Sequence, residues 1–339
     1  IGINHKGSEL RLKKIIDIAS RAKAWAIKFQ YRGINDFYAK KNEIGDEILS
    51  KEIEKSKLQF SKILKFTNYA KNKKLKVGIS FFRTKDLKKY INYINHFDFI
   101  KIPSAEFNND DLINLSKKYS KEIFISSGGN DEKTIISKIE KLDKKKFIVM
   151  HCIANYPTLT GFQQLHFLKK LSNIKNLRYG YSSHDRDWEI NLITMGMGIS
   201  YIERHLTINK SENGLDESSS SENYDFERIC FFANNFEYIL GSGERYPNQG
   251  EIINMQNLGT SFYAKKNLKK GEKLNFSEIE LKAPRLGLSK NEIQFIKNKK
   301  LIANINKNEP VLLSSFKDTK YIFNEKKINF LIDKKISLP

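Results

Sequence analysis

The sequence predicts an α/β protein built as a (β/α)8 TIM barrel, followed by a small β-rich domain. Short apolar runs alternate with helical patterns from the start of the chain to about residue 240. Most of these runs are continuously apolar, which is typical of parallel strands buried on both faces. Beyond residue 260, short strand candidates alternate with Lys/Gly turns, which indicates a change of architecture. Eight strand candidates in a segment of this length favour a closed barrel over an open doubly wound sheet.

The strand candidates follow one another at regular intervals. Residues 1–4 are expected to form the end of the first strand, whose beginning would precede Ile1. The other seven candidates are residues 26–30, 76–81, 97–104, 123–127, 147–152, 179–183 and 201–207. Helical patterns fill the gaps, including the apolar spacing of residues 10–24 and a long run over residues 51–71. A last helix is predicted over residues 223–240.

Changes in composition predict the domain boundaries. The barrel is expected over residues 1–242, and a Gly-rich stretch followed by Pro247 predicts a linker over residues 243–259. Residues 260–316 should form the β-rich domain, which is too small for a chemistry of its own. The tail, residues 317–339, is expected to add a strand or helix that packs back onto the protein.

The composition bears on compartment and partners. The formal net charge is +21, but the lysines are spread over all predicted helices and no nucleic-acid-binding motif accompanies them, so no nucleic-acid partner is expected. Two cysteines, Cys152 and Cys230, make no disulfide framework and fit a reducing cytoplasm. No signal peptide opens the chain, and no apolar run approaches the roughly 20 residues that span a bilayer. We therefore expect a soluble, cytoplasmic protein without a membrane partner.

Two histidines indicate a metal site. His184 ends the seventh strand candidate and His205 lies near the end of the eighth, with one amphipathic helix between them. A strand–helix–strand unit of this length makes its strands parallel, and parallel neighbours lie about 4.8 Å apart. Both imidazoles should then emerge at one edge of the sheet, close enough to share a divalent metal ion. The alternative is that the two histidines only cap their strands.

Polar residues at other strand ends indicate an anion-binding site. Lys101, Ser104 and Glu106 follow one another at the end of the fourth strand candidate, and Lys28 lies on the second. A buried ammonium group must pair with a carboxylate or bind an anionic ligand. Ser126 and Ser182 lie at two further strand ends. They would complete a site that binds a phosphate and a carboxylate. Structural Lys–Glu pairs in the barrel mouth are the alternative.

Loop residues after the strands suit a polyhydroxylated substrate. Asn155 and Tyr156 follow the sixth strand candidate and could hydrogen-bond a sugar, or could simply shape the turn at Pro157. Asp216 precedes a serine run, residues 218–221, that indicates either a flexible loop or a substrate loop leading into a capped helix.

With these motifs in view, the chain resembles the sialic acid synthase (N-acetylneuraminate synthase) family. The β-rich domain is similar to the antifreeze-like (SAF) domain that the family carries at its C-terminus, through residues 264–272. The matching barrel segments occur in the family's order, at residues 2–7, 27–30, 101–106, 126–128, 151–158, 181–184, 203–207 and 216–222.

The resemblance implies a reaction and a role for each matched residue. It implies a transferase that condenses phosphoenolpyruvate with an N-acyl hexosamine, such as N-acetylmannosamine, and releases phosphate with the help of Mn²⁺ or Mg²⁺. The metal ligands would be His184 and His205. The residues that hold phosphoenolpyruvate would be Lys28, Lys101, Ser104, Ser126 and Ser182. Those that hold the amino sugar would be Gln30, Tyr156 and Asp216, and Glu106 would lie beside both substrates.

The resemblance also implies a mechanism and an assembly. Lys28 and Lys101 would balance the charge of the intermediate, and either Glu106 or Asp216 would steer the water or a proton. The family forms a homodimer in which the swapped C-terminal domain brings an arginine to the partner's site. Here Ala283 precedes the proline at which that arginine is expected, and Arg285 follows it as a substitute with a shifted reach.

Further departures fall in the sugar half of the site. The family's acidic residue before Gly-Ile-Asn would precede Ile1. Glu217 follows Asp216 where the family usually has histidine, and Ser183 stands where it has aspartate. The acceptor could therefore be a precursor of a legionaminic- or pseudaminic-type acid instead of N-acetylmannosamine.

Two other functions remain as alternatives. One is a different phosphoenolpyruvate-dependent aldol-type synthase that makes eight- or seven-carbon keto acids, which the antifreeze-like domain disfavours. The other is a non-catalytic barrel that binds a sugar, which the presence of both histidines and both lysines disfavours.

Overall fold

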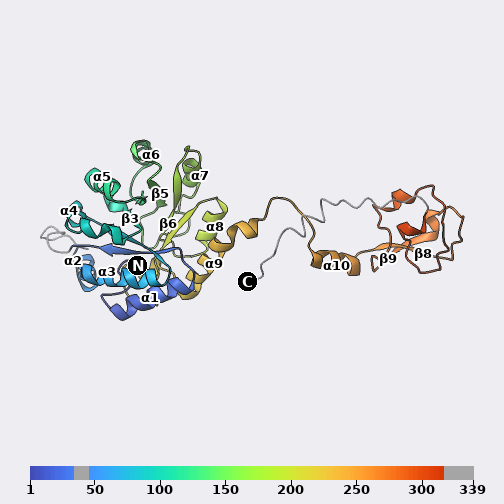
Figure 1. Cartoon of the computed structure of the whole chain (residues 1–339), viewed down its shortest axis with the longest axis horizontal. Helices are drawn as coiled ribbons and strands as arrows, with labels where there is room; N and C mark the ends of the chain where they lie inside the picture. Colours follow the sequence, from blue (N-terminus) through green and yellow to red (C-terminus); the bar gives the residue numbers. More distant parts are fainter. Residues whose placement is uncertain (34–45, 317–339) are drawn as a thin grey trace. The chain divides into compact units, whose positions relative to one another are not determined.

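The structure is a computed structural model that describes residues 1–33 and 46–316, with only the backbone of residues 46–50. The chain divides into two compact units, Ile1–Gly241 and Ser242–Pro339 (Figure 1). The tail for which we expected a strand or helix lies outside the described residues. No helix in the described part of the chain is long and apolar enough to cross a membrane.

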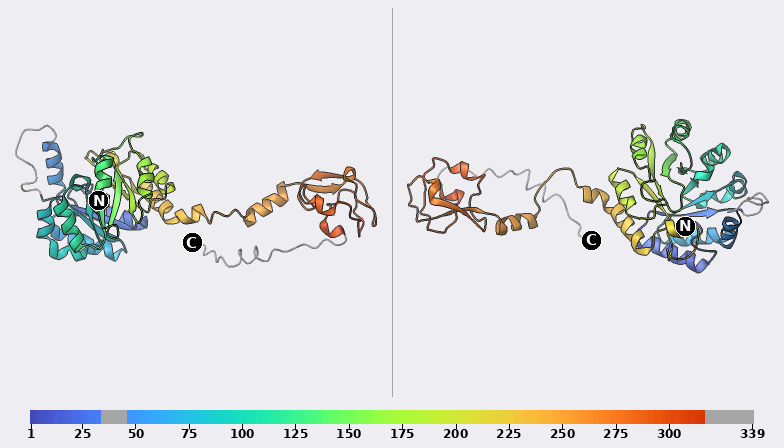
Figure 2. Two further views of the ribbon diagram at one scale, coloured as in Figure 1. Left: turned by 90° about the horizontal axis from the view of Figure 1, so that it is seen from above. Right: turned by 180° about the vertical axis from the view of Figure 1, so that it is seen from behind.

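The first unit is built on one parallel sheet whose strands follow the order of the chain. Its members are β1 (Ala26–Tyr31), β2 (Lys76–Phe81), β3 (Phe99–Ile102), β4 (Ile123–Ser126), β5 (Phe147–Cys152), β6 (Arg178–Ser183) and β7 (Tyr201–Arg204). Figures 1 and 2 show this sheet curled, with the helices around its outside. The predicted α/β class and the parallel sheet covered by helices are confirmed.

The prediction of eight strands closed into a barrel is not met by the described residues. They form seven strands, and β1 and β7 do not pair with each other. Residues 1–4 make no strand ladder, because Ile3 accepts from Lys6 in a turn. The N-terminal ammonium group donates to the carbonyl of Lys28 at 3.0 Å, which is one hydrogen bond to β1 and not a ladder. The sheet is thus a curled, partial barrel.

The helices form where the apolar spacing predicts them, with one correction. The long helical run predicted over residues 51–71 is divided between two helices. The first helix ends at Lys55 and the second begins at Phe60. From the junction into the second helix, Ser56, Leu58 and Phe60 are buried at alternate positions, which is the pattern of extended chain. The helices of the first unit are α1 (Glu9–Arg21), α2 (Asp46–Lys55), α3 (Phe60–Asn72), α4 (Thr84–Lys89), α5 (Asp110–Tyr119), α6 (Glu132–Lys141), α7 (His166–Ser172), α8 (Ile190–Gly196) and α9 (Asn223–Leu240).

An aromatic cluster fills the sheet interior near the start of the strands. Phe99 stacks on Trp25 with ring centroids 5.7 Å apart, and Phe124 meets Tyr201 edge-on at 5.2 Å. Gly78 makes room for this cluster, because a Cβ there would lie 2.1 Å from the Phe99 ring. Polar side chains are thereby left to the carboxyl ends of the strands, where barrel-type proteins carry their sites.

The second unit has a separate small core. Strands β8 (Ser261–Ala264) and β9 (Ile279–Lys282) pair antiparallel, as the β-rich pattern predicts. Helix α10 (Gln249–Leu258) forms within the residues expected to be linker, and it begins at a capping box of Asn248 and Glu251. The core comprises Ala264, Leu268, Ile279, Leu288, Ile296, Leu301, Ile305, Val311 and Phe316.

Candidate active site

Two lysines and one glutamate meet at the carboxyl edge of the sheet. Lys101 on β3 is 2% exposed and its ammonium group contacts the carboxylate of Glu203 on β7. Lys28 on β1 reaches the other oxygen of the same carboxylate at 3.2 Å. Burial lowers the pKa of Lys101, while Glu203 opposes that shift. Burial would raise the pKa of Glu203, but Lys101 and Lys28 outweigh it and hold that pKa well below its usual range. Two cations thus share one anion, which leaves net positive charge for an anionic ligand.

The two predicted histidines lie side by side at the same edge. The ring centroids of His184 and His205 are 5.5 Å apart. Nδ1 of His184 lies 2.9 Å from the carbonyl oxygen of Ile153, and Nδ1 of His205 lies 3.3 Å from an oxygen of Asp216. Each Nδ1 therefore carries the proton that it donates, so that each Nε2 presents a lone pair whenever its ring is neutral. No hydrogen bond engages either Nε2 within residues 1–33 and 46–316.

The pKa shifts of this pair have separate causes. Burial lowers the pKa of His205 while Asp216 opposes the shift, so the neutral ring is favoured. Burial also acts against protonation of His184, but the neighbouring Cys152 outweighs it and raises the pKa of His184. The Sγ atom of Cys152 lies 3.7 Å from Nδ1 of His184.

The pair of imidazoles could hold a metal ion only in an open site. No group of three or more His, Cys, Asp or Glu side chains is arranged to hold a metal ion in the described part of the chain. The protein would thus supply two nitrogen ligands, and water or substrate would supply the rest. An incomplete protein ligand set is typical of catalytic metal sites, whereas structural sites are closed.

Asp216 and Tyr156 complete this side of the site. Burial opposes ionisation of Asp216, but His205 outweighs it and holds the pKa of Asp216 well below its usual range. The Tyr156 ring packs over His184 with centroids 4.1 Å apart, and burial raises the pKa of its phenol. Gly2 passes close to Asp216, where a Cβ would lie 2.5 Å from the carboxylate. A side chain at position 2 would therefore displace the acid.

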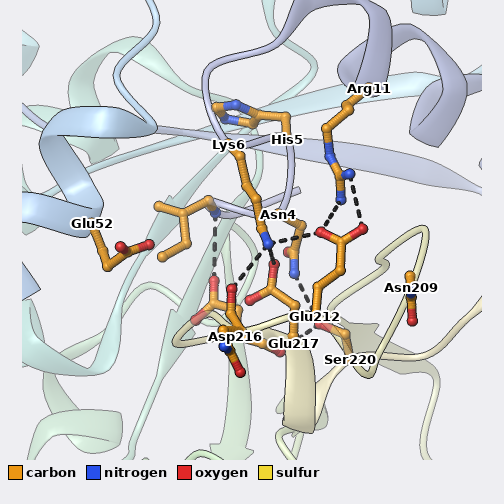
Figure 3. Close-up of polar contacts among 12 residues, drawn as sticks. Asn4, His5, Lys6, Arg11, Glu52, Asn209, Glu212, Asp216, Glu217 and Ser220 are labelled. Carbon is orange, nitrogen blue, oxygen red and sulfur yellow. Dashed lines mark hydrogen bonds and ion pairs between the residues drawn. The ribbon is translucent and has the colours of Figure 1, made fainter.

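The N-terminal segment is fastened over this site by polar contacts (Figure 3). Lys6 pairs with Glu212 at 2.7 Å, and Arg11 donates two hydrogen bonds to the same carboxylate at 3.1 and 3.0 Å. The amide of Asn4 donates to Ser220 at 3.1 Å and its oxygen lies 3.5 Å from Nδ1 of His205. These contacts keep residues 1–11 against the loop that carries Asp216.

The predicted serines lie nearby. Ser126 is buried at the end of β4, and its hydroxyl has no hydrogen-bond partner in the described residues. Ser104 accepts from the backbone of Gly128 at 3.1 Å and contacts Cys152. Ser182 is buried on β6 beside Glu203 in the strand register. A buried hydroxyl without a partner is costly, and a bound ligand would satisfy it.

The remaining predicted residues have other surroundings. Glu106 accepts a hydrogen bond from Asn109 at 2.6 Å. Asn155 is exposed, and Gln30 lies on β1 opposite Ser80. Arg285 lies in the second unit, where it contacts Glu292 at 3.4 Å.

A cavity of about 610 Å³ reaches this edge of the sheet. Lys28, Gln30, Glu203 and His205 line its polar part, and it continues past the unpaired side of β7 toward α9. Its size is within the range of small-molecule sites.

Sequence reasoning assigned no role to Glu203. The signal was present, because Glu203 and His205 are two residues apart and alternate residues of a strand share a face. What the sequence does not show is that the curl of the sheet brings β7 opposite β3.

Taken together, the fold and the site define an α/β protein of the barrel type with a polar site at the carboxyl edge of its strands. A model described as the NeuB family matches residues 15–245, and the chain belongs to that family. The predicted family is thereby confirmed.

Known relatives agree with this assignment. The chain is 30% identical to an uncharacterised protein of Methanocaldococcus jannaschii, over 88% of each chain. It is 27% identical to the N,N'-diacetyllegionaminic acid synthase of Campylobacter jejuni, over 85% of this chain and 90% of the relative. Its fold is similar to the crystal structure of an N-acetylneuraminic acid synthetase from Leptospira borgpetersenii, with a TM-score of 0.65, 24% identity, and coverage of 75% and 87% of the two chains.

Proposed function

We propose that this protein is a synthase of a nonulosonic, sialic-type acid that condenses phosphoenolpyruvate with an N-acyl hexosamine and releases phosphate. Membership of the NeuB family and the activity named for the Campylobacter relative support this class of transferase. The observation that carries the proposal is the pairing of Lys28 and Lys101 on one carboxylate, beside two imidazoles with available Nε2 atoms. The expected location is the cytoplasm.

The proposed metal is Mn²⁺ or Mg²⁺, with Nε2 of His184 and His205 as its protein ligands. When bound, such an ion supplies Lewis-acid polarisation of the acceptor's aldehyde oxygen. Ile153 and Asp216 support this role, because they hold the Nδ1 protons and so orient both rings.

The donor half of the proposal uses the cationic side chains. Lys28 and Lys101 bind the phosphate and carboxylate of phosphoenolpyruvate, with hydroxyl contacts from Ser104, Ser126 and Ser182. Carbon 3 of the donor attacks the aldehyde carbon and water adds to carbon 2. The tetrahedral intermediate then expels phosphate, and the lysines balance the negative charge that develops.

The acceptor half uses Gln30, Asn155, Tyr156 and Asp216. Asp216 is better supported than Glu106 as the group that steers water or a proton. Its carboxylate contacts His205, whereas the carboxylate of Glu106 accepts from Asn109. Asp216 stays ionised at neutral pH because His205 depresses its pKa, so it can accept a hydrogen bond from substrate or water.

The proposal includes a homodimer in which the second unit of one chain serves the site of its partner. Arg285 is the candidate for the residue that crosses over. Its contact with Glu292 spans 3.4 Å and both side chains are about one third exposed, so a ligand could compete for the guanidinium group.

The test is phosphate release from phosphoenolpyruvate in the presence of Mn²⁺ and a panel of N-acyl hexosamines, including N-acetylmannosamine and precursors of legionaminic- and pseudaminic-type acids. His205→Ala should abolish turnover without unfolding the protein, because it removes one of two metal ligands. His166→Ala, at an exposed position that begins α7, is the matched control and should keep full activity.

The outcomes separate the proposal from its alternatives. Release only with pentose or tetrose phosphates would indicate another phosphoenolpyruvate-dependent aldol-type synthase. No release with any acceptor would favour a sugar-binding barrel. Full activity of His205→Ala with unchanged metal dependence would exclude the metal site.

A further inference from the structure

A guanidinium group lies at the rim of the site, and within residues 1–33 and 46–316 it has no ion pair with a carboxylate. Arg32 follows β1 directly and Phe82 follows β2 directly, and the register of Tyr31 with Phe81 makes them neighbours. The Cζ atom of Arg32 lies 3.8 Å from the centroid of the buried Phe82 ring. Stacking on an aromatic face fixes the plane of a guanidinium group and leaves its N–H edge available to a ligand.

The Nε–H donor of Arg32 is unused in the described residues. Its Nε atom is buried and has no hydrogen-bond partner there. The next arginine of this rim differs, because Arg83 forms an ion pair with Asp86 at 2.7 Å. A charged donor that is buried without a partner costs free energy, and a bound oxyanion removes that cost.

Arg32 lies on the acceptor side of the site. Lys28, Gln30 and Arg32 are alternate residues along β1 and the position directly after it, and alternate residues of extended chain share a face, so Arg32 follows the proposed acceptor contact Gln30 on the face that carries Lys28. Its charge also adds to that of His205 in lowering the pKa of Asp216. Asp216 contacts His205, and Tyr156 packs on His184. The donor's two anionic groups already have Lys28 and Lys101, so Arg32 is left for an anion on the other substrate.

We propose that Arg32 determines acceptor specificity by binding an anionic substituent, so that the acceptor is an N-acyl hexosamine bearing a phosphate or carboxylate group. This inference rests on the proposed function, which it narrows to a class of charged acceptors. Guanidinium binds both groups with paired N–H donors, and this shared geometry defines the recognition.

The test compares three acceptors that differ at carbon 6, in wild type, Arg32→Gln and Arg32→Lys. They are N-acetylmannosamine, its 6-phosphate and its uronic acid, which carry a hydroxyl, a phosphate and a carboxylate. Wild type should prefer one of the anionic acceptors in kcat/KM. Arg32→Gln should lower that preference by about 10- to 100-fold, the range for a charge-assisted hydrogen bond, and Arg32→Lys should lower it less.

A second cationic residue provides the control. Arg21 is exposed at the end of α1, before β1 begins, so Arg21→Gln removes the same charge from the opposite end of the sheet. It should leave the preference unchanged, and the KM for phosphoenolpyruvate should stay constant in all variants. A wild type that prefers the neutral acceptor, an equal preference in Arg32→Gln, or an effect on the donor's KM alone would overturn the inference.

Calorimetry separates failure of this inference from failure of the proposed function. Absence of phosphate release from every acceptor would overturn the proposed function. In that case, calorimetry measures how tightly the two anionic sugars bind to wild type and to Arg32→Gln without turnover. This comparison tests whether Arg32 binds the anionic group of the sugar. Weaker binding of either anionic sugar to the variant supports the assignment, and equal binding of both overturns it.

Discussion

Glu217 is a buried carboxylate whose two oxygens have no hydrogen-bond partner in the described residues. Its nearest cation is Lys6, at 3.8 Å. Burial raises the pKa of Glu217 above its value in the unfolded chain, while Lys6 opposes the shift. The folded state therefore favours the neutral acid. Its contribution to stability is fully present below the unfolded pKa and is lost as the pH rises through the folded pKa.

Replacing this acid with its neutral amide should stabilise the protein under alkaline conditions. We expect Glu217→Gln to raise the free energy of unfolding by about 1 kcal/mol at pH 8 and to change it little at pH 4, as measured by urea denaturation. Glu140→Gln, at an exposed position on α6, should have no effect at either pH. Destabilisation by Glu217→Gln at pH 8, or a pH-independent difference, would contradict this account.

Strand ends explain which site residues could be found from sequence. Lys28, Lys101, His184 and His205 each lie at or near the end of an apolar run, and parallel strands bring such ends to one edge. The structure brings these four together, while their roles stay predictions. Glu203 was missed because its partners come from strands far away in sequence, and their proximity depends on the curl of the whole sheet.

At the scale of elements, the hydrophobic pattern of the sequence predicted the positions of the strands more accurately than the boundaries of the helices. Continuous apolar runs coincide with β1–β7 within a few residues, because both faces of each strand are buried. The break between α2 and α3 was missed, since apolar residues at positions 58, 60 and 63 fit helical and extended chain alike. The first strand candidate failed because four residues carry too little pattern to distinguish a strand from a turn.

Packing between β2 and β3 depends on Gly78, which has no side chain. We expect Gly78→Ala to lower the free energy of unfolding by about 2 kcal/mol, because its Cβ would lie 2.1 Å from the Phe99 ring. Urea denaturation measures this cost. The second change Phe99→Leu should restore part of the loss, because it removes the atoms that clash.

A second glycine supplies the matched control. Gly196 ends α8, and a Cβ there would meet no atom within 4 Å. Gly196→Ala should therefore be neutral or stabilising by about 0.5 kcal/mol. Equal costs for the two glycine variants would show that backbone entropy, and not the space for Phe99, explains the effect.

At the scale of the whole molecule, the change of pattern along the sequence anticipated two cores. Apolar residues of the first unit pack around the parallel sheet, and those of the second pack around β8 and β9. The hydrophobic pattern of a sequence reflects such local burial. It therefore predicts both the parallel sheet of the first unit and the β-rich core of the second. It carries no information on which chain's second unit serves which site, because that depends on assembly.

The proposed exchange of second units can be tested by mixing two inactive variants. Arg285→Ala should lose activity through its altered second unit, and His205→Ala through its altered first unit. In a dimer that exchanges these units, a mixed pair contains one site with both residues intact and one site with neither. Random mixing after subunit exchange should then restore about a quarter of wild-type activity, since half of the dimers are mixed and each has one competent site.

Light scattering should give twice the chain mass. Phosphate release that stays at the level of the separate variants, in mixtures shown to contain mixed dimers, would mean that each chain completes its own site or that Arg285 takes no part.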